Sequence, residues 1–83
     1  MKDDKGLYYH PYPGNKRARM YVRETGEGVC FRLWFADDPE LWKEHGWMPY
    51  DAILEAATMY EGDFDPREAY NIDIARELIR RGI

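Results

Sequence analysis

Residues 16–36 read KRARMYVRETGEGVCFRLWFA, and this stretch decides the fold. Two runs of alternating apolar and polar residues flank the sequence Thr25-Gly26-Glu27-Gly28. Alternation with period two is typical of β-strands. A two-residue loop of Gly26 and Glu27 suits a type II′ turn, which takes glycine first. The pattern therefore predicts an antiparallel hairpin.

The predicted hairpin has two chemically different faces. One face can build a core from Ala18, Met20, Val22, Phe31, Leu33 and Phe35. The other, called here the basic-aromatic face, carries Arg17, Arg19, Tyr21, Arg23, Arg32 and Trp34. A one-residue slip would mix the faces, whereas a two-residue slip would preserve them. The tight turn favours the register that pairs Met20 with Leu33, Val22 with Phe31, Arg19 with Trp34 and Tyr21 with Arg32.

The segment before the hairpin reads as one further strand. Gly6–Tyr12 alternates in the same way, and Pro11 lacks an N–H group, which suits an edge strand or the end of a strand. Tyr12-Pro13-Gly14-Asn15 has proline and glycine where a type II turn takes them. Residues 1–5 have no such pattern, so we expect a flexible N-terminus.

Helices are expected after the hairpin. Asp38 can cap a short helix whose first residue is Pro39 and which Gly46 ends. Trp47-Met48 is expected to be an extended linker, because the residue before Pro49 avoids helical angles. Apolar residues at helical spacing predict a second helix over Pro49–Glu61, which Gly62 stops.

A last helix begins either at Pro66, after the cap residue Asp65, or again at Asn71, and Gly82 closes it. Its apolar stripe consists of Ile74, Ala75, Leu78 and Ile79. Strands followed by helices indicate an α+β domain over residues 6–83. We expect a small antiparallel meander of two or three strands, with two or three helices packed on its apolar face.

Composition and charge narrow the function classes. Residues 1–36 hold seven Lys/Arg and four Asp/Glu, whereas residues 37–83 hold five and twelve, so the two parts carry about +3 and −7. Such a dipolar chain can bind an anion or pair head to tail with another copy, and two solvated surfaces would look the same. The lone Cys30 allows no internal disulfide, and no apolar run could span a bilayer. We therefore expect a cytoplasmic protein that does not bind membranes.

The basic-aromatic face is the first candidate binding site. Its arginines could hold phosphates while its rings stack on bases of RNA or single-stranded DNA. The same residues could instead form cation–π pairs within the hairpin, lie under a helix, or bind another protein. A second candidate is Trp47 with Met48, which could form an apolar patch for another chain or plug the core.

The sequence gives little support for a catalytic or metal-binding site. His10, Cys30 and His45 are far apart in the sequence, whereas structural zinc sites use closely spaced ligands. Cys30 could act as a nucleophile beside a histidine, but no spacing selects that arrangement. Nucleophile-elbow and phosphate-loop motifs are absent. We expect no enzyme activity, no metal and no cofactor.

Thirteen aromatic residues in 83 exceed what a small core requires. We therefore expect a non-enzymatic protein-interaction module that self-associates, as a homodimer for example, or docks to another protein. Nucleic-acid binding through the basic-aromatic face is the alternative.

Overall fold

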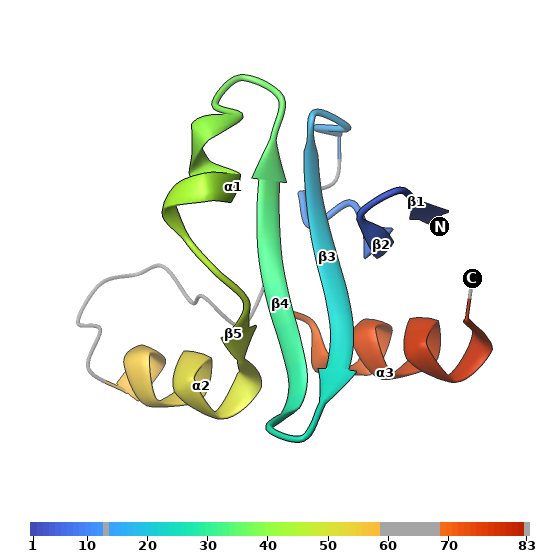
Figure 1. Cartoon of the computed structure of the whole chain (residues 1–83), viewed down its shortest axis with the longest axis vertical. Coiled ribbons are helices and arrows are strands. Elements are labelled where there is room, and N and C mark those ends of the chain that lie inside the picture. The colour runs from blue at the N-terminus through green and yellow to red at the C-terminus, as the bar shows by residue number, and fades with distance from the viewer. Residues whose placement is uncertain (13, 59–68, 83) are drawn as a thin grey trace.

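The hairpin of residues 16–36 forms the centre of the sheet. The computed structural model describes residues 1–12, 14–58 and 69–82 (Figure 1). Strands β3 (Ala18–Thr25) and β4 (Gly28–Phe35) pair antiparallel. Their register joins Met20 to Leu33, Val22 to Phe31, Arg19 to Trp34 and Tyr21 to Arg32, as the alternation predicts.

The turn of this hairpin differs from the expected type. Thr25 pairs with Gly28, so the loop has two residues as predicted. However, the left-handed glycine is Gly28, with φ of 99°, and Gly26 has no positive φ. A turn followed by a left-handed glycine is typical of the bulged hairpin connection rather than of type II′. The prediction of a type II′ turn is therefore wrong.

The described residues form five strands rather than the expected two or three. The order is β1-β2-β3-β4-β5, with every neighbouring pair antiparallel. Lys2–Asp3 forms β1, within the segment expected to be flexible, and Met48–Pro49 forms β5, within the expected linker. Strand β2 (Gly6–Tyr9) consequently lies inside the sheet and is not an edge strand.

The turn between β2 and β3 has the predicted geometry. The Asn15 N–H donates to the Tyr12 carbonyl at 3.0 Å, and Gly14 has φ of 85°. Both features belong to a type II turn, in which the third residue must be left-handed. Pro13 itself lies outside the described residues.

Three helices are described. Helix α1 (Glu40–Glu44) begins after Pro39, and no side chain caps it, so the expected role of Asp38 as a side-chain cap is wrong. Helix α2 (Tyr50–Thr58) begins one residue after Pro49; the predicted stop at Gly62 and the start signal at Asp65 lie outside the described residues. Helix α3 (Ile72–Arg81) follows the cap residue Asn71, at the later of the two predicted starts, and Gly82 caps its end.

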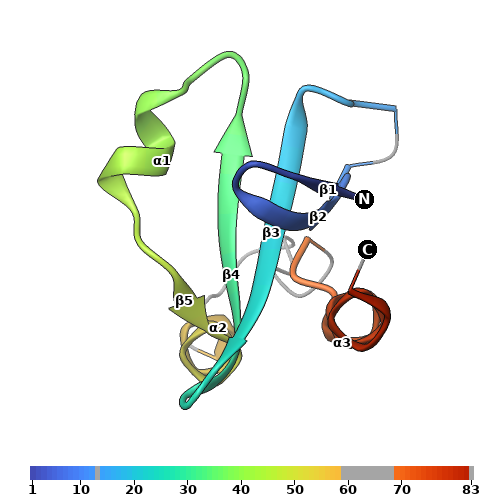
Figure 2. The same ribbon diagram turned by 45° about the vertical axis from the view of Figure 1, so that its right-hand side comes forward.

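The core lies on the apolar face of the sheet. Its buried cluster consists of Tyr9, Met20, Val22, Phe31, Ile53, Ala69 and Ala75. Ile53 belongs to α2 and Ala75 to α3, so these two helices cover this face as expected. Figure 2 shows α3 end-on beside β3.

Helix α1 lies on the opposite, basic-aromatic face. Its Trp42 ring packs edge-on against Tyr21 at 5.3 Å between centroids, and Figure 2 shows α1 and α3 on opposite sides of the hairpin. The expectation that the helices share one face is therefore wrong for α1. Within residues 1–12, 14–58 and 69–82, no helix is long and apolar enough to cross a bilayer.

Candidate functional site

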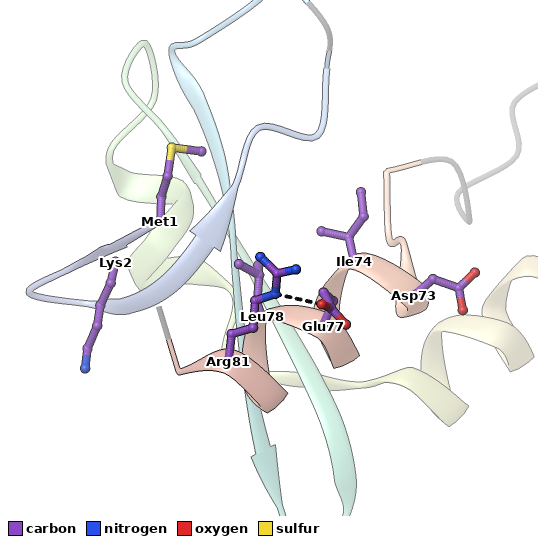
Figure 3. A pocket seen from close by; sticks show the side chains of 7 residues that line it. All are labelled: Met1, Lys2, Asp73, Ile74, Glu77, Leu78 and Arg81. Carbon is purple, nitrogen blue, oxygen red and sulfur yellow. Dashed lines mark hydrogen bonds and ion pairs between the residues drawn. The ribbon is translucent and has the colours of Figure 1, made fainter.

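A groove runs between the first residues of the chain and α3. Its volume is about 600 Å³, and we call it the β1–α3 groove; its lining residues are Met1, Lys2, Asp73, Ile74, Glu77, Leu78 and Arg81. Figure 3 shows Ile74 and Leu78 projecting from α3 on the side of β1. This is an apolar channel with charged side chains along its rim.

The start of α3 is fixed by hydrogen bonds that set the rotation of the helix. The Asn71 side chain accepts from the N–H groups of Asp73 and Ile74, at 3.0 and 3.1 Å. The Tyr9 hydroxyl accepts from the Asn71 N–H at 2.9 Å. Ala75 then faces the core. Since successive helical residues are about 100° apart, Ile74 falls on the flank that faces the groove.

The groove gathers exposed apolar side chains. Among the described residues, the exposed large hydrophobic side chains are Met1 at 52 %, Ile74 at 40 % and Met48 at 39 %. Two of these three line the groove. Ile74 belongs to the predicted apolar stripe of its helix, but it is exposed, whereas Ala75 of the same stripe is buried. Leu78 is half-buried and packs against the core.

The charges of the groove are ordered along the helix. Asp73 lies in the first turn of α3, and Arg80 and Arg81 lie in the last. Between them, Glu77 pairs with Arg80 at 2.5 Å and with Arg81 at 2.7 Å. Figure 3 draws the contact between Glu77 and Arg81. These two guanidinium groups hold the pKa of Glu77 below its usual value. The rim is thus anionic at one end and cationic at the other.

The structure brings most residues of the basic-aromatic face into contact with aromatic rings. Arg19 lies over Tyr8 and Trp34, with its Cζ 5.0 and 5.1 Å from the ring centroids. Arg32 lies over Trp42 at 4.0 Å, and its Nε and one terminal nitrogen donate to the Trp42 carbonyl.

Two further arginines of this face differ in their contacts. Arg23 lies over Trp47 with 4.2 Å between its Cζ and the ring centroid. Arg17 does not join this stack and instead pairs with Asp37 at 2.5 Å in an exposed contact. Trp42 and Trp47 come from beyond the hairpin and partly cover the basic-aromatic face.

Tyr21 is fully buried under these rings. Its hydroxyl donates to the Asp3 carboxylate at 2.5 Å, and Arg19 pairs with the same oxygen at 3.1 Å. Burial, and then the hydrogen bond to Asp3, raise the pKa of Tyr21 to about 12. Although burial alone would raise the pKa of Asp3, the Tyr21 and Lys5 hydrogen bonds and the Arg19 charge hold it below its usual value. In this arrangement Tyr21 supports the sheet from within and presents no surface to a partner.

The predicted interface residues Trp47 and Met48 have different surroundings. Trp47 is half-buried between Arg23 and Trp42, whose ring centroid is 6.0 Å away. Met48 is exposed on the edge strand β5. The side chain available to a partner at this position is therefore mainly that of Met48.

The residues considered for catalysis remain apart. Cys30 is buried, with its Sγ 3.5 Å from the Thr25 hydroxyl. His10 Nδ1 lies 3.2 Å from the Ala18 carbonyl, and His45 lies at the end of α1. In the part of the chain that is described, no three His, Cys, Asp or Glu residues are placed to hold a metal ion.

Sequence reasoning missed the β1–α3 groove. Met1 lies in the segment expected to be flexible, and Ile74 fits the apolar stripe of its helix equally well inside or outside the core. In the sequence, only the predicted helix start at Asn71 gives information about the rotation of α3, and it does not indicate which segment lies beside the helix.

Comparisons with protein-family models, with curated proteins and with solved structures found no match.

Proposed function

We propose that the chain is a non-enzymatic module that binds a second copy of itself through the β1–α3 groove. The observation that carries this proposal is the placement of Met1 and Ile74, two of the three most exposed large apolar side chains described, along one groove. Apolar patches rimmed by polar residues typically mark protein interfaces.

Charge complementarity favours a second copy as the partner. A two-fold interface brings the same surface together with itself, so each group meets a different group of the partner. If two α3 helices pack antiparallel, Asp73 of one protomer lies near Arg81 of its partner, and the reverse. Eight residues separate these positions, or about 12 Å along the helix. The two ends of the surface are therefore complementary to the ends of its own inverted copy.

The sheet edge supports the same arrangement. Strand β1 is an outer strand with two residues, and its outward side has no strand partner among the described residues. Such an edge can pair antiparallel with the same edge of another chain. Burial of Ile74 and Leu78 between the protomers would supply the apolar centre of the interface.

The alternative of nucleic-acid binding has weaker support. Arg19 and Arg17 already pair with carboxylates, and Arg32 holds the Trp42 carbonyl. Fewer guanidinium groups are then left to replace the counterions of a phosphate backbone.

The test is sedimentation of the purified chain over a range of concentrations, at low and high salt, with and without mixed oligonucleotides. We expect a dimer that persists at high salt, because salt screens interactions between charges and has little effect on apolar contacts. Ile74→Glu should abolish it by placing a charge in the apolar centre.

Met48→Glu is the matched control, because Met48 is equally exposed and lies on β5, at the opposite edge of the sheet from β1. This variant should leave the dimer intact. Loss of the dimer in Met48→Glu alone would move the interface to Trp47 and Met48 and overturn the groove as its site. A monomer that binds oligonucleotides in a salt-dependent manner would overturn self-association and support the nucleic-acid alternative.

A further inference from the structure

Strand β4 has an open stretch of backbone on the side of β5. Pairing with β5 involves only Cys30 and Phe31. The Ala36 N–H donates to the Arg17 carbonyl on the β3 side, whereas the Phe35 carbonyl accepts from Asp38 on the opposite side. Because alternate residues of an antiparallel strand turn their backbone groups to opposite neighbours, Leu33 faces away from β3. No described strand lies against Leu33 on that side.

A cavity of about 250 Å³ lies at this place, between β4, α1 and β5. Its lining residues are Phe31, Arg32, Leu33, Leu41, His45, Gly46, Met48 and Tyr70. The walls are mainly aliphatic and aromatic. The open backbone of Leu33 therefore belongs to an apolar cavity that also holds two basic residues.

Both ends of the open stretch are closed, which limits what can enter. At one end Met48 pairs with Phe31. At the other end Arg32 binds the Trp42 carbonyl of α1, and Asp38 donates to Phe35 at 3.2 Å. A partner strand would need a longer free edge. The volume also lies below the range typical of drug-sized ligands, so it suits a small molecule.

The charges of the lining select the ligand. Arg32 and His45 are its basic residues, and no Asp or Glu lines the cavity among residues 1–12, 14–58 and 69–82. Arg32 uses Nε and one terminal nitrogen on the Trp42 carbonyl, and its other terminal nitrogen has no hydrogen-bond partner in the described part of the chain. A backbone N–H and a guanidinium are donors that carboxylates accept with strong hydrogen bonds.

From the cavity, its open backbone and its basic residues we infer a binding site for a small carboxylate with an apolar body, such as a short aryl or acyl acid. The carboxylate binds Arg32 and the Leu33 N–H, with His45 beside it. The apolar body lies against Leu33, Leu41 and Tyr70. This site is separate from the β1–α3 groove and does not depend on self-association.

Two-dimensional NMR of the whole chain tests the inference with three probes of one shape: benzoate, benzamide and benzylammonium. Benzoate should produce saturable shifts of the Leu33 and Gly46 amide signals and of the Met48 methyl signal. Benzamide should bind at least about tenfold more weakly than benzoate, because it lacks the charge that strengthens such hydrogen bonds. Benzylammonium should produce no saturable shift at these signals.

Variants identify the binding group. Arg32→Gln should weaken benzoate binding about tenfold, whereas Arg17→Gln, which removes an equal charge outside the cavity, should not change it. Because Arg32 also holds α1, two further variants avoid that contact. Leu41→Trp should abolish binding by filling the cavity, and His45→Gln should weaken it. Ile74→Glu should have no effect.

Three results would overturn the inference: no saturable shift with benzoate, equal affinity for benzoate and benzamide, or unchanged benzoate binding in Leu41→Trp.

Discussion

At the residue scale, Tyr9 joins the sheet to α3. Its hydroxyl donates to the Ala69 carbonyl at 2.5 Å and accepts from the Asn71 N–H at 2.9 Å. Burial raises the pKa of Tyr9 to about 12, so the hydroxyl keeps its proton throughout the neutral range. One side chain on β2 thereby satisfies two backbone groups immediately before α3. The rotation of α3, and with it the exposure of Ile74, depends on this contact.

Tyr9→Phe should lower the free energy of unfolding by about 1–3 kcal/mol, because the Ala69 carbonyl and the Asn71 N–H lose their partner. Urea unfolding of the variant measures this change. Tyr8→Phe is the matched control, because the Tyr8 hydroxyl makes no hydrogen bond within residues 1–12, 14–58 and 69–82. Its effect should stay within about 0.5 kcal/mol. Equal effects of the two substitutions would contradict the proposed role of Tyr9.

At the element scale, one carboxylate ties β1 to β3, beyond its pairing with β2. Asp3 accepts from the Tyr21 hydroxyl at 2.5 Å, from Arg19 at 3.1 Å and from the Lys5 N–H at 2.8 Å. The Tyr8 N–H also donates to the Met1 carbonyl at 2.9 Å. These bonds place Met1 and Lys2 beside α3, so they build one wall of the groove.

The depressed pKa of Asp3 predicts a pH dependence of stability. Because the folded state lowers this pKa, the contribution of Asp3 is present above the unfolded value, about 3.9, and is lost as the pH falls through the folded value. Asp3→Asn should cost about 1 kcal/mol at pH 7, and the difference from the natural chain should be smaller at pH 3, below the unfolded pKa. Urea unfolding at both pH values measures it. Taking the difference removes the parallel contribution of Glu77. A difference that does not change with pH would contradict this role of Asp3.

The elements show what sequence patterns predict and what they miss. The β3–β4 register could be predicted for two reasons. The alternation along these eight-residue strands fixes which residues share a face, and the tight turn then selects one register. Strands β1 and β5 have two residues each, which is too short for any period. Their pairing is decided by distant groups such as Tyr21 and Phe31.

The candidate site is harder to predict for the same reason. An apolar stripe on α3 indicates a buried side but not its centre, which the Asn71 cap and the packing of Ala75 determine. The groove then needs β1, which no pattern reveals. By contrast, the separation of the two hairpin faces follows directly from the alternation, and the pairing of Arg19 with Trp34 follows from the register.

At the scale of the whole molecule, the charges are unevenly distributed. Residues 1–36 are net basic and residues 37–83 are net acidic. Within α3 the order is reversed locally, with Asp73 first and Arg81 last. An antiparallel dimer through α3 joins unlike charges at both ends of the interface, whereas a parallel dimer would join like charges.

A charge exchange tests this orientation. Asp73→Arg and Arg81→Asp should each weaken the dimer about five- to tenfold, because the two-fold axis creates two like-charged pairs, each costing up to about 1 kcal/mol. The double variant should restore most of the affinity, as measured by sedimentation. Arg80→Asp is the control, since Arg80 also pairs with Glu77 but does not line the groove. A double variant that is weaker than either single one would exclude the antiparallel arrangement.

The three tryptophans lie on the side of the sheet opposite the core. Trp34, Trp42 and Trp47 each have a guanidinium over the ring, and none belongs to the buried core cluster. The tryptophan fluorescence of the protein therefore originates from the α1 side alone. Tryptophan emission follows events at that surface, including detachment of α1, whereas far-ultraviolet circular dichroism follows mainly α2 and α3, the longer helices, which cover the core. The two optical signals of the unmodified chain thus weight its two sides differently, without any introduced label.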